Sequence, residues 1–367
     1  MSIERNKTME EKKDLALYAL TPTGGKLALR LAEAFPQAEV FLHEKIATDY
    51  HQEGGSWPIS SFPAEGLSKL LARNFHLFRS HVFIMATAIA VRTIAPHLTD
   101  KWRDPAVVVV DEKGRWAISL LGGHWGGAHE LARDIARKIK AQPVITTATD
   151  LSGKTAIEVW ARKQGLCLEN VSEVKAFNAA LVREIPIFCW SEYPKYLARL
   201  PEGVIAWDGW GSLAGDFLII ISDRTDFPRW PAKHLLLLRP PTLFLGLGCN
   251  RGTSEDEIHR QVKDILAEHG YSILSLAELG TIDRKADEPG LLAFARRLGL
   301  KISFFNQEEL NRLDPPSPPS EYVKNILGVK GVSECAAMLL SGEQNLVIPK
   351  TKRGNVALAL ARKKLED

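Results

Sequence analysis

Cysteine, net charge and long hydrophobic segments are all scarce in this 367-residue sequence. Its four cysteines lie far apart and form no CxxC pair, so we expect neither a structural disulfide nor a structural zinc site, and a reducing, cytoplasmic location fits best. The longest apolar stretches, such as 216–221, are far too short to span a bilayer. Residues 1–14 are polar and charged and lack the apolar region of a signal peptide. We therefore expect a soluble protein with no membrane partner.

The charge balance argues against a protein that binds nucleic acid. The sequence has 47 basic and 44 acidic residues, a formal net charge of +3, whereas a nucleic-acid-binding domain normally carries a basic stripe or patch. A mild positive excess is compatible with an acidic small molecule but does not require one. The apolar fraction of 45% and the charged fraction of 25% are ordinary for a globular protein with sizeable cores.

The fingerprints of nucleotide-binding loops are also missing. The segment Gly246–Glu257 has the wrong glycine spacing for a GxGxxG loop and lacks the Gly-Lys-Ser/Thr ending of a P-loop. No clear loop for S-adenosylmethionine is present either. These absences disfavour a nucleotide-dependent oxidoreductase and a methyltransferase.

Strands and helices alternate along the sequence in a way that predicts a three-part α/β protein. We expect N- and C-terminal α/β domains with parallel or mixed sheets at 1–150 and 240–367, and a smaller α/β middle domain at 151–239. The residue patterns predict strands at 15–20, 39–42, 81–85, 106–110, 116–121, 185–189, 217–221, 234–239 and 243–247, and helices at 26–35, 67–78, 89–97, 128–140, 155–163, 172–183, 254–269 and 290–298. The proline-rich segment 314–320 is expected to be an exposed loop.

The strongest local signal is the glycine-rich segment Leu120–Ala132. A predicted strand ends at Leu121, four glycines follow, and a helix begins near Ala128. Glycines let a ligand approach the main chain, and the N–H groups at a helix start suit an anion or an oxyanion. His124 lies in this loop, where a general acid, a general base or an axial metal ligand could be placed. A tight turn in which His124 binds a neighbouring carbonyl explains the pattern equally well, and His129 is expected to be solvated.

A second loop, at 246–257, follows the first predicted strand of the C-terminal domain. Ser254 and Glu257 have the spacing of a capping box. Arg251 stands where open α/β sheets bind ligands, and its planar guanidinium suits a carboxylate. The interpretation of Arg251 as a solvated arginine in a turn explains the sequence at least as well. Glu288 lies before the next predicted helix and is placed to interact with its N-terminus.

Three other segments, Met85–Arg92, Asp104–Glu112 and Ile282–Gly290, could together line one cleft at the carboxyl ends of the strands. Thr21–Lys26 has the geometry of a weak anion-binding turn. Met85–Arg92 places small residues after a strand and an arginine near the next helix start. Asp111 and Glu112 are expected to shape a turn with Gly114.

Taken together, these segments resemble the cobalt-precorrin-5A hydrolase family of the anaerobic cobalamin pathway. The resemblance covers most of the chain and is weaker in the middle. The segments that carry it are Ile84–Arg92, Asp104–Glu112, Gly122–Ala132, Pro143–Asp150, Gly246–Thr253, Lys285–Leu291 and Gly331–Glu334. The sequence departs from the family pattern at Ala88, Gly122 and His129, where the family often has glycine, serine and asparagine.

The resemblance implies that water opens the δ-lactone joining a ring-A acetate to C20 of cobalt-precorrin-5A. The C20 carbon then leaves with its methyl group as acetaldehyde, which gives cobalt-precorrin-5B. Such a reaction needs a base to activate water and donors that stabilise a tetrahedral oxyanion. Cobalt would arrive inside the substrate, so neither a protein metal site nor a cofactor is expected. Other enzymes of the pathway are possible transient partners.

The expected site combines residues from several of these loops. His124 is the candidate general base or acid, and the amides of Gly126 and Gly127 are the candidates for polarising the lactone carbonyl. The expected substrate-binding residues are Arg92, Gly123, Arg251, Gly252, Thr253 and Glu288, with the two arginines binding carboxylates of the macrocycle. A contact from His124 to the substrate cobalt competes with the base role. The alternative function is a non-catalytic corrinoid-binding or hand-over protein that uses the same loops.

Overall fold

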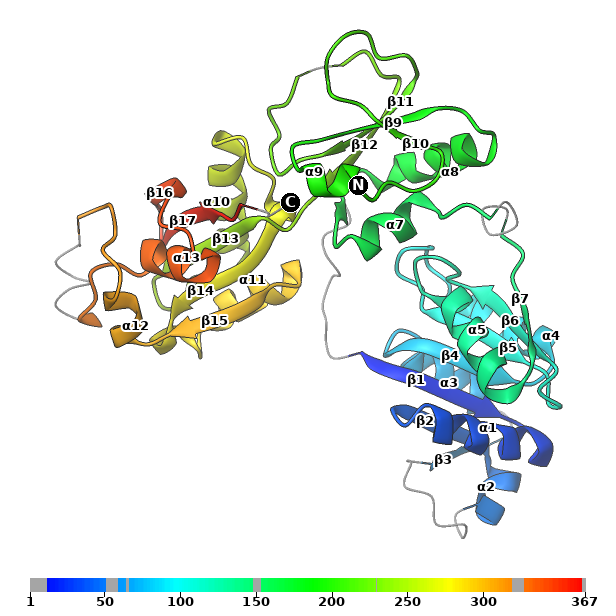
Figure 1. Ribbon diagram of the computed structural model, residues 1–367. Coiled ribbons are helices and arrows are strands. Elements are labelled where there is room, and N and C mark those ends of the chain that lie inside the picture. Colours follow the sequence, from blue (N-terminus) through cyan, green and yellow to red (C-terminus); the bar gives the residue numbers. More distant parts are fainter. Residues whose placement is uncertain are drawn as a thin grey trace. The chain divides into compact units, whose positions relative to one another are not determined.

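The computed structural model describes residues 12–50, 59–63, 66–147, 153–228, 230–318 and 327–364. The chain divides into two compact units, one formed by Glu10–Val159 and the other containing Trp160–Asp367. Figure 1 shows their elements, and each unit is described by itself. Among the described helices, none has the length and apolar character needed to span a bilayer.

The first unit is built on a seven-stranded mixed sheet with the order β3-β2-β1-β4-β5-β6-β7. Its strands are β1 (Lys13–Ala19), β2 (Ala38–His43), β3 (Ile59–Phe62), β4 (Phe78–Ile84), β5 (Ala106–Val110), β6 (Trp116–Leu121) and β7 (Gln142–Val144). Strands β1 to β5 are parallel, β6 runs antiparallel to β5, and β7 runs parallel to β6. The fully buried strand β5 consists of alanine and valine only, as expected for a strand covered on both faces.

Helices cover both faces of this first sheet (Figure 1). They are α1 (Pro22–Ala34), α2 (Glu44–Tyr50), α3 (Gly66–Asn74), α4 (Thr87–Ile94) with the short 3₁₀ turn η1 (Ala95–His97), and α5 (Ala128–Ile139). One core joins Leu17 of β1 to the buried faces of α1 and α5. The other joins the next residue, Tyr18, to α3 and α4. This switch between neighbouring residues follows from the two-residue period of a strand.

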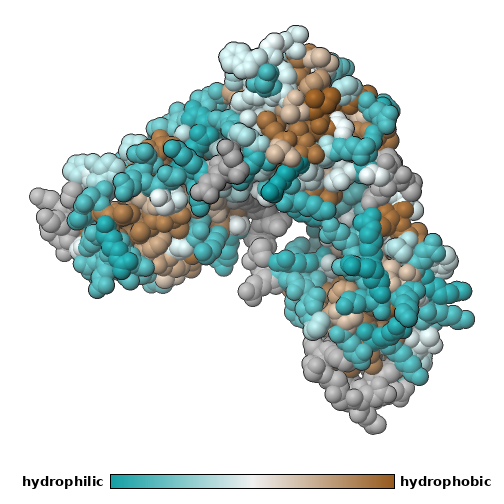
Figure 2. Space-filling model, in the orientation of Figure 1, coloured by the Kyte–Doolittle hydropathy of each residue, from teal (hydrophilic) through white to brown (hydrophobic). Residues whose placement is uncertain are grey.

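The second unit contains two five-stranded sheets. One has the order β10-β9-β11-β12-β8 and the other β15-β14-β13-β17-β16. The part of the chain that contains the sheet β10-β9-β11-β12-β8 has the elements α7 (Ile157–Lys163), β8 (Cys167–Leu168), η2 (Val171–Glu173), α8 (Val174–Val182), β9 (Ile187–Ser191), α9 (Pro194–Leu197), β10 (Val204–Ala206), β11 (Phe217–Ile221) and β12 (His234–Arg239). Strands β10, β9, β11 and β12 are parallel, and β8 is antiparallel to β12. Figure 2 shows hydrophobic residues gathered on this part of the surface, which exposes Val182, Ile185, Ile205 and Trp210.

The last sheet is also mixed. Its elements are β13 (Leu243–Cys249), α10 (Glu255–Glu268), η3 (Ile273–Ser275), β14 (Leu276–Ile282), η4 (Asp283–Lys285), α11 (Pro289–Leu298), β15 (Lys301–Phe305), α12 (Gln307–Asn311), α13 (Ser333–Ser341), β16 (Leu346–Arg353) and β17 (Val356–Arg362). Strands β13, β14 and β15 are parallel, and the hairpin β16–β17 adds two antiparallel strands. Helices α10 and α11 share a core with one face of the sheet.

The expected three-part α/β architecture is confirmed, and all three sheets are mixed. Their strands occupy 13–144, 167–239 and 243–362, while the domain limits proposed from the sequence stay predictions. Residues 314–318 form neither helix nor strand, as expected, and the last two residues of that segment lie outside the described ones. The sequence did not indicate α2, β3, β7, β8, α9, β10, β15, α12, α13, β16 or β17.

The two sheets of the second unit are joined by a buried charged network around Asp223. This carboxylate is fully buried and lies after β11. It accepts hydrogen bonds from Nε (2.8 Å) and Nη2 (3.0 Å) of Arg362 at the end of β17, and also from Tyr193 and Thr242. Nearby, the buried guanidinium of Arg239 binds the carboxylate of Glu169 and donates to the carbonyl of Ser222 (2.9 Å). A buried charge needs such partners, and the pairing of Asp223 with Arg362 links the two sheets.

Helix α13 packs directly on the backbone of β13. A Cβ placed on Gly246 would lie 1.7 Å from the carbonyl oxygen of Ser333, the first residue of α13. Two residues along the same strand, a Cβ on Gly248 would have no heavy atom nearer than 3.9 Å. The glycine at 246 therefore serves the packing of a helix on a strand.

Replacing Gly246 with alanine should destabilise the second unit by about 3 kcal/mol, because either β13 or α13 must move to admit the methyl group. Gly248→Ala is the matched control and should leave stability unchanged or slightly higher, since glycine weakens a strand. Denaturant unfolding of both variants measures this difference. Equal midpoints for the two variants would contradict the packing argument.

His81 is a buried histidine that is part of the aromatic core of the first unit. Its Nε2 lies 3.0 Å from the carbonyl oxygen of Phe75, and its Nδ1 lies 3.2 Å from the hydroxyl of Tyr18. The rings of Phe75, Tyr18 and Phe83 stack on it. Burial lowers the pKa of His81 to about 4, because the charged imidazolium is desolvated there.

The first unit should therefore lose stability as the pH falls from about 6.5 to about 4. Below pH 6.5 the unfolded chain protonates His81 while the folded unit does not, which shifts the balance by about 3 kcal/mol over this range. The pH dependence of the unfolding free energy checks this, with an NMR titration of the ring. His81→Phe should flatten the profile, and an unchanged slope in that variant would assign the effect to other groups.

Candidate functional site

The loop that carries His124 connects β6 to α5. It turns sharply at both ends, where Gly122 has φ +66° and Gly127 has φ +88°, values that favour glycine. A Cβ on Gly122 would lie 2.8 Å from the carbonyl oxygen of Pro105, and one on Gly126 would lie 2.8 Å from the carbonyl oxygen of Gly122. The loop is thus folded tightly against its own backbone and the start of β5.

The first amides of α5 bind carbonyl oxygens of this loop. The N–H of Ala128 donates to the carbonyl of Gly122 (3.1 Å), and the N–H of His129 donates to that of Gly123 (3.1 Å). The expectation that the helix start presents unpaired N–H groups is therefore wrong for these two residues. Donation to a ligand from Gly126 and Gly127, which precede them, stays a prediction.

His129 is buried, and the expectation of a solvated surface residue is wrong. Only 6% of its surface is exposed. Its Nδ1 lies 2.8 Å from the hydroxyl of Ser119 on β6, and its Nε2 lies 2.9 Å from the hydroxyl of Thr147. Because residues 128, 132, 135, 136 and 139 are also buried, position 129 belongs to the buried stripe of this helix. That periodicity was the signal that could have identified it.

His124 is half-buried and contacts His129. The two imidazole rings lie edge to face, with centroids 4.7 Å apart and an interplanar angle of 88°. The next residue, Trp125, makes a similar edge contact with Trp102 at 5.1 Å. His124 is therefore part of an aromatic arrangement that includes side chains from outside its loop.

Arg92 lies in the last turn of α4, not near its start as the sequence suggested. It is exposed, and the same helix exposes two large apolar side chains, Ile89 and Val91.

The second loop lies between β13 and α10 and holds the remaining candidates. Thr253 is buried, and its hydroxyl donates to the carbonyl of Asn250 (2.7 Å). Ser254 caps α10 by accepting from the N–H of Glu257 (3.3 Å). The expected reciprocal half of the capping box is replaced, because the carboxylate of Glu257 binds Asn355 on the turn of the β16–β17 hairpin.

The buried carboxylate of Glu288 binds the backbone of this loop. Only 1% of its surface is exposed, and its carboxylate accepts from the N–H of Gly252 (2.7 Å) and from Nζ of Lys285 (3.0 Å). Burial raises the pKa of Glu288, but these hydrogen bonds and the positive charges of Lys285 and Arg251 outweigh it and hold the pKa below its usual value. The structure thus gives Glu288 a role in shaping the loop.

Arg251 is exposed and already faces a carboxylate. Its side chain is 67% exposed, and Nη1 lies 3.1 Å from a carboxylate oxygen of Asp287, while Nη2 donates to the carbonyl of Arg284 (3.3 Å). Hydrogen bonding to Asp287 raises the pKa of Arg251. A substrate carboxylate that binds here would have to exchange with Asp287.

The weaker candidates are explained by local structure. Thr21 caps α1 by accepting from the N–H of Gly24 (3.2 Å), so its hydroxyl serves the helix start. Asp111 shapes the β5–β6 turn, as expected, by accepting from the N–H groups of Arg115 and Trp116 at 2.7 Å each. Within the described residues, no three His, Cys, Asp or Glu side chains are grouped to hold a metal ion.

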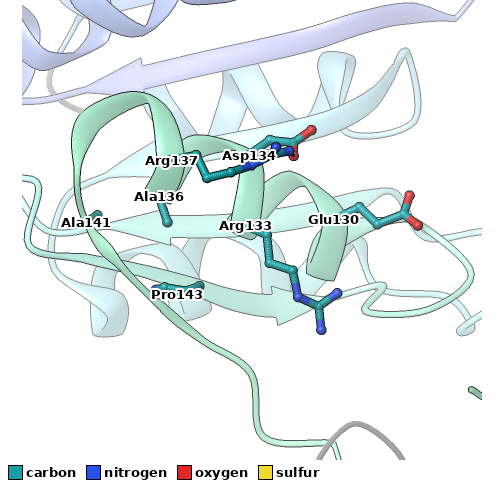
Figure 3. Close-up of a pocket in the computed structure, with 7 residues that line it drawn as sticks. All are labelled: Glu130, Arg133, Asp134, Ala136, Arg137, Ala141 and Pro143. Carbon is teal, nitrogen blue, oxygen red and sulfur yellow. The ribbon is translucent and has the colours of Figure 1, made fainter. Parts of the chain in front are cut away.

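A shallow pocket of about 620 Å³ lies on the first unit but contains none of the predicted site residues. It is lined by Glu130, Arg133, Asp134, Ala136, Arg137, Ala141 and Pro143, shown in Figure 3. The charged side chains come from the outer face of α5, where Arg137 pairs with Asp134. The pocket is therefore a charged surface depression and not the glycine-rich loop.

The structure brings the predicted residues together in two groups. One loop of the first unit contains Gly123, His124, Gly126 and Gly127. Arg92 lies in helix α4 of the same unit. Arg251, Gly252, Thr253 and Glu288 share one loop region of the second unit. The expectation of one cleft for both groups stays a prediction.

Three family models match the chain in succession. "Cobalamin synthesis G N-terminal" matches residues 69–150, "Cobalamin biosynthesis central region" matches 155–240, and "Cobalamin synthesis G C-terminus" matches 243–361. Together they cover well over half of the sequence.

Curated relatives match over nearly the whole length. A protein of Priestia megaterium named cobalt-precorrin-5A hydrolase is 34% identical over 361 residues, which cover 96% of this chain and 95% of that protein. A protein of Salmonella typhimurium with the same name is 35% identical, covering 90% of this chain and 93% of that protein. A solved structure of a cobalamin biosynthesis protein G homolog from Sulfolobus solfataricus aligns over 96% of this chain and 98% of that one, with 22% identity and a TM-score of 0.39.

Replacing Glu288 with alanine should destabilise the second unit by about 1–3 kcal/mol, because the N–H of Gly252 and the half-buried ammonium of Lys285 lose their acceptor. Asp287→Ala is the matched control at the neighbouring position, where the carboxylate is exposed, and it should leave unfolding unchanged. Thermal and denaturant unfolding of the two variants provide the comparison. Similar losses in both would show that burial of Glu288 does not set its contribution.

Proposed function

Because this chain belongs to the cobalt-precorrin-5A hydrolase family, we propose that it hydrolyses cobalt-precorrin-5A in cobalamin biosynthesis. The observation that carries the proposal is identity of 34–35% to two proteins of that name over nearly the full length of each chain. The names of these relatives favour an enzyme over the alternative of a non-catalytic corrinoid-binding or hand-over protein. The product would be cobalt-precorrin-5B, with release of acetaldehyde.

The chemistry requires water to attack the carbonyl carbon of the ring-A δ-lactone. A base must take a proton from that water, and donors must stabilise the oxyanion that forms on the carbonyl oxygen. The ring opens when the carbon–oxygen bond of the tetrahedral intermediate breaks, which leaves the acetate as a carboxylate. Loss of the C20 carbon and its methyl group as acetaldehyde then needs a proton at the carbon that remains.

His124 is our proposed general base or acid for these proton transfers. Its half-buried place in a tight loop would let one ring nitrogen face a bound substrate while the loop limits its movement. The amides of Gly126 and Gly127 are the proposed oxyanion donors, and Gly123 allows the substrate to approach the main chain. A contact between His124 and the substrate cobalt competes with the base role.

Arg92 and Arg251 are the proposed partners of the macrocycle carboxylates. Both guanidinium groups are exposed, and such groups bind carboxylates in a bidentate manner. Gly252 and Thr253 would form the substrate side of the second loop. Glu288, first expected to touch the substrate, supports this binding in our proposal by holding the N–H of Gly252.

We propose that cobalt enters with the substrate and that no separate cofactor takes part. The four cysteines are free thiols, which agrees with the cytoplasmic location expected from the sequence. Transient contacts with other cobalamin-pathway enzymes belong to the same proposal. Nothing in the sequence pattern or the charge balance favours a nucleic-acid partner.

The purified protein should release acetaldehyde when incubated with cobalt-precorrin-5A, and His124→Ala should lower kcat about 10²- to 10⁴-fold, as loss of a general acid–base does. Acetaldehyde can be measured with a coupled alcohol dehydrogenase assay. Arg133→Ala on the outer face of α5 is a suitable control for a surface change in the same unit. Normal turnover by His124→Ala would remove His124 from the mechanism, and binding of the corrinoid without acetaldehyde would favour the hand-over function.

A further inference from the structure

We infer that His129 is a positioning residue for His124, an inference that rests on the hydrolysis proposed above. Four residues, 125–128, separate the two histidines in the sequence, and their rings meet edge to face at 4.7 Å. His124 belongs to the loop, whereas His129 belongs to α5 and to the core side of that helix. Through this contact, the side chain of His124, which is the proposed proton-transfer group, is connected to the rigid part of the unit.

The ring of His129 is fixed at both of its nitrogens. Ser119 on β6 holds Nδ1 at 2.8 Å, and Thr147 beyond β7 holds Nε2 at 2.9 Å. A hydroxyl can donate or accept, so this pair is satisfied by either tautomer of the neutral ring. Because the hydroxyls lie on separate segments, they fix the orientation of the imidazole plane.

The backbone is shaped to admit this ring. A Cβ on Gly123 would lie 2.4 Å from both Cε1 and Nε2 of His129, so any other residue at 123 would displace the imidazole. The carbonyl of Gly123 accepts from the N–H of His129 itself, at 3.1 Å. The residue before His124 is thus joined to His129 by a hydrogen bond and by close packing.

The consequence for His124 is a restricted side chain. Proton transfer demands that a base be held within hydrogen-bond distance of its target, and a misplacement of about 1 Å can cost 10²-fold in rate. An aromatic edge-to-face contact has a preferred geometry, which an aliphatic side chain of similar volume does not reproduce. His129 would then influence turnover without touching the substrate.

The test compares His129→Leu, His129→Phe and Ser119→Ala with the intact enzyme in the acetaldehyde assay. His129→Leu should lower kcat about 10²-fold with KM changed less than twofold, because the bound substrate meets a misaligned His124. His129→Phe keeps an aromatic ring and should recover about tenfold of that loss. Ser119→Ala should cost about tenfold alone and nothing further when combined with His129→Phe, since phenylalanine has no nitrogen for the hydroxyl to hold.

His81→Phe is the control for a purely structural effect, since it also removes a buried histidine from the first unit. It should lower stability and leave kcat within twofold. If the three site variants behave in the same way, with lowered melting temperatures and unchanged kcat, His129 is structural and the inference is overturned.

The ring resonances of His124, measured by NMR on labelled protein, separate this inference from the proposed function. They should shift in His129→Leu, stay close to those of the intact protein in His129→Phe, and not respond to His81→Phe. If the intact protein releases no acetaldehyde, the proposed function fails, but the resonances still decide the positioning role. Identical His124 resonances in all variants would overturn it.

Discussion

Close approach to the main chain of a glycine at the starts of helices is the constraint on which both candidate loops depend. In the first unit, Gly123 lies against the ring of His129, and in the second, a Cβ on Gly290 would lie 2.0 Å from the carbonyl oxygen of Thr253. Gly246 lies equally close to α13. A methyl group would displace the imidazole at the first place, and at the other two it would force backbone segments apart. The glycines that mark these segments in the sequence are therefore required by packing before any ligand is considered.

Buried carboxylates also join segments that are distant in the sequence. Glu288 binds the N–H of Gly252, and Glu334, with 1% of its surface exposed, binds the N–H groups of Ser317 and Lys350. Asp223 instead binds side chains, and its pairing with Arg362 links two sheets. Each carboxylate is costly to bury but costs more to remove, because its partners would be left unpaired. The second unit thus places its charged side chains where segments distant in sequence meet.

The sequence predicted the elements whose residue pattern fits only one type of secondary structure. The runs of valine and isoleucine in β5 and β11 and the strand–glycine–helix order around His124 were identified at nearly the observed limits. The hairpin β16–β17 was missed because the sequence of β17, Val356–Arg362, alternates alanine and leucine, which also favour helices. Helix α13 was missed because seven of its nine residues are buried, so it has no polar face to give a helical period.

The candidate site was predictable in its location but not in its contacts. Glycine spacing placed both loops after the correct strands, β6 and β13. The hydrogen bond between His129 and Thr147 joins residues that lie 18 positions apart, with another strand between them. The pairing of Arg251 with Asp287 depends on the approach of a loop 36 residues away. Such contacts come from tertiary structure, and local sequence carries no signal for the partner.

The two loops differ in what they can offer a polycarboxylate. His124 is held by a buried neighbour, so its environment is fixed before substrate arrives and little has to be ordered on binding. Arg251 lies in water, paired with an equally exposed aspartate whose pKa is lowered by that pairing. Solvent and salt screen such a pair, so a carboxylate from a ligand can replace Asp287 at little cost. The first loop thus offers a preorganised side chain and the second an exchangeable cation, which are the properties that the roles proposed for His124 and Arg251 require.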